Sequence, residues 1–169
     1  MFEFEDIYTI SSCSGRITLL DALMPWHRRG STILFKKHTP IEVEDIKPYM
    51  NVGVVNRLWL VVTGPIIHAS ANNVLTARKL LKIARKAGMK HSGILSFSKD
   101  KGFIVELKTG VRVANLIKTK DEVLIKDDQA LRYLVETANE ALLEGKEKLN
   151  KLRVELGLKP VDYSRFLKR

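Results

Sequence analysis

The feature that most constrains the fold is a long apolar seam near the C-terminal end of the chain. From Leu131 to Leu156, apolar or small residues recur at alternating steps of four and three positions. This spacing is typical of one helix that packs along its whole length against other elements. Two aspartates at 127–128 supply an N-cap, and Gly157 supplies a C-terminal stop. The pattern therefore predicts a helix from about residue 128 to about residue 156.

The length of this helix has a consequence for the rest of the molecule. With a rise of 1.5 Å per residue it spans ~45 Å, which exceeds the width expected of one domain of this size. We therefore expect its last turns to project and to contact a partner or a second copy of the chain. We predict that residues 161–169, which follow Pro160, form a mobile tail.

Short apolar runs bounded by turn residues fill the chain ahead of this helix. They predict strands at residues 7–10, 17–20, 32–35, 58–63, 66–70, 94–97 and 103–107, with weaker ones at 110–117 and 122–125. Helical spacing predicts two further helices, at residues 42–49 and 74–87. We predict an α+β fold in which residues 1–169 form a single domain, with a mixed, largely antiparallel central sheet packed by helices.

Composition limits the cellular compartments and the binding partners that fit this chain. The formal net charge is +10, which is typical of a protein that binds a polyanion such as RNA, although a lysine-rich solvated surface would give the same number. No apolar run is long enough to cross a membrane. Cys13 is the single cysteine, so the chain forms no internal disulfide and no cysteine-based metal cluster. We therefore expect a cytoplasmic protein without a metal site.

Two basic segments are candidates for RNA binding. Four cations lie on one face of the helix predicted at 74–87, and no acidic residue between 74 and 90 can pair with them; they are Arg78, Lys82, Arg85 and Lys86. The second segment combines one aromatic residue with two cations, Trp26, Arg28 and Arg29, which could stack on a base and contact phosphates. Simple solvation of the charges is the alternative for both.

Small polar residues form a dense cluster between the first two predicted strands, at Ser11, Ser12, Cys13, Ser14, Gly15 and Arg16. We interpret this segment as a loop whose amides and hydroxyls converge on an anion that Arg16 also attracts. An ordinary hairpin turn is the alternative, because Ser and Gly are common turn residues.

Two histidines are candidate proton acceptors. His38 lies at a strand end, and His68 lies inside an apolar run. A surface or core histidine without chemistry is the alternative for each. The residue pattern does not rank the two.

Four motifs in order resemble the tRNA wybutosine-synthesizing protein 3 family. They are residues 8–17 around the Ser-Ser-Cys-Ser-Gly-Arg string, the His-Thr-Pro at 38–40, Leu58-Trp59 followed by Pro-Ile-Ile-His at 65–68, and Gly-Met-Lys-His-Ser-Gly-Ile at 88–94. The resemblance covers residues 8 to about 97. Lys37 and His91 stand where relatives often have an aromatic residue and an asparagine. Relatives also carry a helix before the Ser-Ser-Cys string, so we expect the start to be truncated.

The resemblance implies an S-adenosylmethionine-dependent methyltransferase that does not use the Rossmann-type methyltransferase fold. Its implied substrate is tRNA(Phe), in which it methylates N-4 of 7-(3-amino-3-carboxypropyl)-4-demethylwyosine next to the anticodon. The motif positions imply that the 11–16 segment, Trp59, His91, Ser92 and Gly93 bind substrate or cofactor. His38 or His68 would then accept the proton that the ring nitrogen loses.

Two other classes of function remain open at this stage. One is a thiol enzyme in which Arg16 lowers the pKa of Cys13 and a histidine serves as its base. The other is an RNA-binding module without catalysis, held by the 78–86 face and Trp26.

Overall fold

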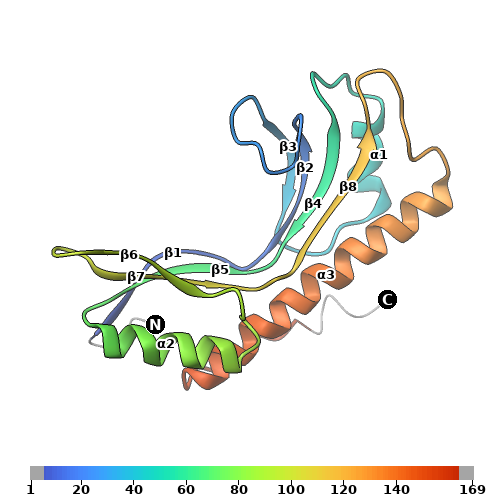
Figure 1. The fold of residues 1–169 in the computed structure, drawn as a ribbon. Coiled ribbons are helices and arrows are strands. Elements are labelled where there is room, and N and C mark those ends of the chain that lie inside the picture. Colours follow the sequence, from blue (N-terminus) through green and yellow to red (C-terminus); the bar gives the residue numbers. More distant parts are fainter. Residues whose placement is uncertain (1–5, 164–169) are drawn as a thin grey trace. The chain divides into compact units, whose positions relative to one another are not determined.

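The computed structural model describes residues 6–163, and residues 1–5 and 164–169 lie outside the description. The described residues form β-strands and three α-helices (Figure 1). They are β1 (Ile7–Cys13), β2 (Arg16–Asp21), β3 (Thr32–Lys37), α1 (Val43–Met50), β4 (Leu58–Thr63), β5 (Ile66–Ala71), α2 (Val74–Lys86), β6 (Gly93–Ser98), β7 (Gly102–Lys108), β8 (Arg112–Lys118) and α3 (Asp128–Glu155).

The described chain divides into two compact units, each built from separate segments. The first unit contains residues 6–15, 64–110 and 144–163, and the second contains residues 16–63 and 111–143. The chain passes from one unit to the other at Gly15, Thr63, Gly110 and Leu143. Because neither unit is one continuous segment, the expectation of a single domain stays a prediction.

The first unit consists of a four-stranded antiparallel sheet in the order β1-β5-β7-β6, covered on one face by helices. Figure 1 shows α2 lying along that face. Alternate strand residues Ile67, Ala69, Val105 and Leu107 point into a core that also holds the buried side of α2. The opposite face of this sheet carries the other alternate residues, which include His68 and Glu106.

The second unit contains the other four-stranded antiparallel sheet, in the order β3-β2-β4-β8. One face of β2 and β4 packs against α1 and the first half of α3, and the core residues are Ile17, Leu19, Ile41, Ile46, Val54, Leu58, Leu60, Val62, Ile117, Leu131, Val135, Ala138 and Leu142. The α+β class, the antiparallel pairing and the long C-terminal helix are thus confirmed. The strands, however, form two sheets and not one central sheet.

The apolar seam of α3 explains how one helix serves both units. Leu131, Val135 and Leu142 belong to the core of the second unit, whereas Leu152 and Leu156 belong to the core of the first. The expectation that the last turns project was therefore wrong. It compared the helix with one core, whereas the chain builds two and the helix contributes to each.

Most other sequence expectations are confirmed at the level of elements. Helix α2 starts at an Asn73 N-cap whose side chain accepts from the Thr76 amide, 2.9 Å away, and β6 and β7 pair as an antiparallel hairpin. The strand predicted at 122–125 was wrong, since only Val123 forms a bridge, with Lys118. A turn at Thr119–Glu122 lies directly before Val123.

The segment after α3 is hydrogen-bonded to that helix as far as the description extends. Asn150 exchanges two bonds with the backbone of Val161, of 2.8 and 2.9 Å. The ring of Tyr163 lies against Lys146, with 5.2 Å from Nζ to the ring centroid. The predicted mobile tail stays a prediction, because residues 164–169 lie outside the described residues.

Candidate active site

The predicted polar loop at residues 11–16 is mostly strand in the structure. Ser11, Ser12 and Cys13 belong to β1 and pair with His68, Ile67 and Ile66 of β5. Only residues 14–15 connect the strands, and Gly15 takes a φ of +92° that favours glycine. The interpretation as a cradle of converging amides was therefore wrong for Ser11 to Cys13, because strand pairing with β5 aligns their backbone groups along the ladder.

A β-bulge decides where the first two serines of this string point. The register shifts between Thr9 and Ser11, so Thr9 pairs with Ala69 but Ser11 pairs with His68. Thr9 thus points to the helix-covered face, whereas Ser11 lies on the opposite face. Ser12 follows by alternation on the helix-covered side. The adjacent residues Ser11 and Ser12 therefore lie on opposite faces of the sheet.

On the face without helices, three polar side chains form a row across three neighbouring strands. Ser11 of β1 pairs with His68 of β5, which in turn pairs with Glu106 of β7. Ser11 Oγ lies 2.9 Å from His68 Nδ1, and His68 Nε2 lies 3.1 Å from Glu106 Oε2. The His68 side chain is 30% exposed and that of Glu106 is 20% exposed. The ring is therefore held from both sides while it stays accessible.

On the other side of β1 lies a pocket of about 240 Å³. Ser12, Ser14 and Arg153 provide polar groups, and leucines of α3 together with Ile67 provide the apolar part of its lining. The Nε–H of Arg153 donates to the Lys159 carbonyl at 2.7 Å, which fixes the guanidinium. Hydroxyls, one guanidinium and an apolar wall suit a small amphiphilic ligand that carries a carboxylate.

Lys146 is a buried cation beside the Cys13–Ser14 end of β1. Its residue exposure is only 3%, and Nζ lies 3.4 Å from both the carbonyl and the hydroxyl oxygen of Ser14. Burial lowers the pKa of Lys146, and the neighbouring Cys13 partly offsets this shift. Burial also raises the pKa of Tyr163, which packs against Lys146, and Arg153 counteracts this.

Three residues predicted to act in catalysis or to bind substrate or cofactor belong to the second unit. Arg16 is the first residue of β2 and pairs with Thr63. His38 follows β3 and is exposed, next to Lys37, whose Nζ donates to Asp45 at 2.8 Å. Trp59 Nε1–H donates to the Ala22 carbonyl at 3.1 Å. The structure places Arg16 in a different unit from residues 11–15, with which it was predicted to act.

The predicted motif at 91–93 opens β6 as expected. Ser92 is buried and bridges the backbone, donating to the Met89 carbonyl at 2.7 Å and accepting from the Lys108 amide at 3.0 Å. His91 is exposed and lies against Gly110, where a Cβ would come within 2.6 Å of its Nε2. Gly93 pairs with Glu106 across the β6–β7 ladder, and a Cβ on Gly93 would meet nothing within 4 Å. The row of polar side chains therefore borders open space at this glycine.

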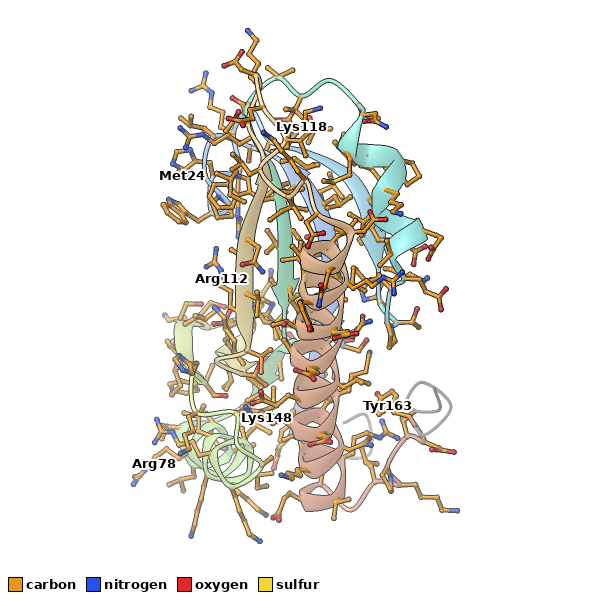
Figure 2. All side chains as sticks on the ribbon, turned by 90° about the vertical axis from the view of Figure 1, so that its right-hand side faces the viewer. Met24, Arg78, Arg112, Lys118, Lys148 and Tyr163 are labelled. Atoms are coloured by element: carbon orange, nitrogen blue, oxygen red, sulfur yellow. The ribbon has the colours of Figure 1, made fainter. Side chains whose placement is uncertain are left out.

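The cations predicted to bind RNA all lie on the surface. On α2, Arg78, Lys82, Arg85 and Lys86 are exposed, and Figure 2 shows Arg78 on the outer side of this helix. Lys86 is paired with Glu155 of α3 at 2.8 Å, so sequence inspection of α2 alone missed its partner. In the second unit, Trp26 is 62% exposed, and Arg28 and Arg29 are exposed beside it. Each unit thus carries its own basic segment.

Three site residues were missed from the sequence, namely Glu106, Lys146 and Arg153. Glu106 occupies an alternate, solvent-side position of a strand, where a glutamate is unremarkable until strand order is known. Lys146 directly follows Gly145, which is one of the residues of the apolar seam. This neighbouring position was the one sequence signal that Lys146 is buried. Among the described residues, no group of three or more potential ligand side chains could hold a metal ion. The described helices likewise include none with the length and apolarity to span a membrane.

The sequence and the fold match a defined class of enzymes. Residues 1–157 match the family described as Methyltransferase TYW3. Among solved structures, a protein from Aeropyrum pernix has a TM-score of 0.83 and 32% identity, covering 91% of this chain and 89% of that one. A protein from Pyrococcus horikoshii has a TM-score of 0.83 and 29% identity, covering 92% of this chain and 79% of that one. The class is thus a methyltransferase that lacks a Rossmann-type sheet.

Two curated relatives carry a specific activity in their names. A protein of Saccharolobus solfataricus is 49% identical over 148 residues, which is 88% of this chain and 70% of the relative. One of Archaeoglobus fulgidus is 37% identical over 155 residues, 90% of this chain and 76% of the relative. Both are named tRNA(Phe) 7-((3-amino-3-carboxypropyl)-4-demethylwyosine(37)-N(4))-methyltransferase. The chain belongs to the Methyltransferase TYW3 family.

Proposed function

We propose that this chain is an S-adenosylmethionine-dependent tRNA methyltransferase of wyosine biosynthesis. Its proposed substrate is tRNA(Phe) that carries 7-(3-amino-3-carboxypropyl)-4-demethylwyosine, and the methyl group goes to N-4 of that base. The observation that carries the proposal is membership of the family together with 49% identity to a relative named for this reaction. The net charge of +10 supports an RNA substrate.

We place the proton-transfer chemistry at His68 and not at His38. Methylation of a neutral ring nitrogen leaves a cation unless the ring loses a proton, so the site needs an acceptor within hydrogen-bond reach. His68 has a hydroxyl on one ring nitrogen and a carboxylate on the other, and it remains 30% exposed. This arrangement supports a base that is oriented and stabilised when it becomes charged.

The pocket beside β1 is the proposed site for an amino-acid carboxylate. S-Adenosylmethionine carries such a group and supplies the transferable methyl when it is bound. Ser12, Ser14 and Arg153 would hold the carboxylate, and the leucines of α3 would cover the methylene chain. The aminocarboxypropyl arm of the substrate base carries the same group, so this pocket could serve either ligand. Cys13 is the single cysteine of the sequence, which fits a reducing cytoplasm, where we place the reaction.

A transfer assay tests the proposal. Wild-type protein is incubated with S-adenosylmethionine labelled in the methyl group and with tRNA(Phe) that carries the demethylated base. We expect label in the tRNA, and we expect none when the tRNA has unmodified guanosine at the same position. An absence of label with the demethylated tRNA would overturn the proposal.

The same assay separates methyl transfer from thiol chemistry. We expect the Cys13→Ser variant to retain activity within about fivefold, because a positioning hydroxyl can replace a positioning thiol but not a thiolate nucleophile. Loss of more than about a hundredfold would instead support the thiol enzyme.

A further inference from the structure

The row formed by Ser11, His68 and Glu106 has a defined direction of hydrogen bonding. A carboxylate only accepts hydrogen bonds, so the Nε2 that faces Glu106 carries a hydrogen. In a neutral imidazole the other nitrogen then has a lone pair, and Nδ1 accepts from the Ser11 hydroxyl over 2.9 Å. The hydroxyl hydrogen of Ser11 therefore points toward Nδ1 of His68. Ser11 is an exposed residue, and its oxygen keeps its lone pairs as acceptors.

We propose that these three side chains form a proton relay, in which Ser11 receives the proton of the substrate and Glu106 is the positioning residue for His68. This inference rests on the proposed function. It adds a serine between substrate and histidine, and it assigns a role to a glutamate outside the family motifs found in the sequence.

The proposed step transfers one methyl group to the substrate and passes a proton from the substrate through Ser11 to His68. A bound methylsulfonium donor supplies the methyl group and leaves as a neutral thioether, with the sulfur keeping the carbon–sulfur bonding pair. A nitrogen lone pair of the substrate forms the new N–C bond. The N–H proton of the substrate passes to Ser11 Oγ while the hydrogen of Ser11 passes to His68 Nδ1, and the N–H electron pair stays in the ring system. His68 is then an imidazolium that faces Glu106, and it later releases its proton to water.

The β1 bulge on one side of the row and Gly93 on the other support a relay and not a simple structural contact. The bulge between Thr9 and Ser11 is what brings this serine to the face of His68. On the other side of the row, Gly93 is paired with Glu106 and has no neighbouring heavy atom within 4 Å of a Cβ position. A flat base could therefore approach the row without displacing a side chain there.

The first test is kinetic and uses the Glu106→Gln variant. Glutamine keeps the size of the side chain but removes the charge that stabilises the imidazolium. We expect kcat for methyl transfer to fall about tenfold to hundredfold with an unchanged KM for tRNA, in line with a weakened general base. Glu122→Gln is the matched control, because it removes an exposed glutamate paired with Lys126 in the second unit. We expect its kcat to equal that of the wild type.

The second test is spectroscopic and needs no substrate. Nitrogen-15 NMR distinguishes the two tautomers of a neutral histidine, and the His68→Ala variant assigns the signal among the four histidines. We expect the Nε2–H tautomer in the wild type and a mixture in Glu106→Gln, since an amide can donate as well as accept. The Nδ1–H tautomer in the wild type would overturn the proposed direction of the relay.

The two possible failures are distinguishable. If the wild-type protein transfers no methyl group to the demethylated tRNA, the proposed function fails and the relay fails with it. If the wild type is active and Glu106→Gln retains its full kcat, only the relay is overturned.

Discussion

Two sets of polar side chains, one in each unit, form different kinds of hydrogen bonds. In the second unit, two buried side chains bind backbone, and one of them is Asp21, whose carboxylate accepts from the Val55 and Asn56 amides at 2.7 and 2.9 Å. Lys118 likewise donates to the Met50 and Val52 carbonyls at 3.0 and 2.8 Å (Figure 2 labels its position). In the first unit, Ser11, His68 and Glu106 bind one another and stay partly accessible.

This difference separates structural polar groups from candidate chemical ones. Removal of a side chain whose bonds all end on main chain leaves orphaned backbone groups, so such a side chain supports the fold. A side chain bonded to a second titratable side chain can pass a proton along the contact. The comparison therefore predicts opposite phenotypes for the two units, namely lost activity for one and lost stability for the other.

The largest expected effect is on the rate of methyl transfer. We expect His68→Ala to lower kcat about 10²–10⁴-fold, which is the usual contribution of a general base. The melting temperature should change little, because the ring is partly exposed and lies outside the apolar core. His38→Ala is the matched comparison in the second unit, and we expect it to retain most activity. An equal loss in both variants would contradict the placement of the base.

The next effect is on stability in the second unit. Asp21→Ala leaves two backbone amides without their charged acceptor, so we expect the free energy of unfolding to fall by about 2–4 kcal/mol. Urea denaturation measures this, with Asp121→Ala, an exposed carboxylate of the same unit, as the control. An unfolding free energy like that of the wild type would mean that water replaces the carboxylate at little cost.

The sequence predicted the elements better than it predicted the assembly of the site. Periodicity found α2, α3 and seven of the eight strands closely, because burial of one face is a local property of the sequence. The division into two sheets was missed, since strand partners depend on contacts between distant segments. The Ser11–Arg16 string shows how unknown strand partners led to a wrong prediction of the site. As one loop, the string predicted one site, but β1 alternation, one bulge and the start of β2 place its residues in three different environments.

Site residues outside the motifs could not have been found by pattern alone. Glu106 becomes relevant only because β7 lies next to β5, which brings it opposite His68. Arg153 lines the pocket because the second half of α3 packs in the first unit. The resemblance to a family supplied the reaction and the importance of the Ser-Ser-Cys string, which composition and spacing did not.

A smaller effect concerns which unit contacts the tRNA backbone. Lys82→Gln with Arg85→Gln removes two exposed cations of α2, and Arg28→Gln with Arg29→Gln removes two from the second unit. If both α2 cations neutralise phosphates, the slope of log K against log salt should fall by about 2 in the first double variant. We expect a smaller change in the second, where Trp26 would still stack on a base. The reverse order would move the main RNA surface to the second unit.

The smallest predicted effect concerns Lys146, a buried cation of the first unit that can be compared with Lys118 of the second. Lys146 is buried, and both of its oxygen contacts, at 3.4 Å to Ser14, are long for strong hydrogen bonds. Burial lowers the pKa of Lys146 below its usual 10.5, so the unfolded chain binds this proton more tightly than the folded chain. Charged Lys146 therefore costs stability at neutral pH, and this cost disappears as the pH rises toward 10.5.

We expect Lys146→Met to be more stable than the wild type at pH 7 by a margin that shrinks at pH 10, measured by urea denaturation at both values. Lys151→Met, at an exposed position of the same helix, should show no such trend. A margin that stayed constant with pH would show that Lys146 keeps its ordinary affinity for the proton, and that its ammonium group is as well satisfied at β1 as Lys118 is by the carbonyls of the second unit.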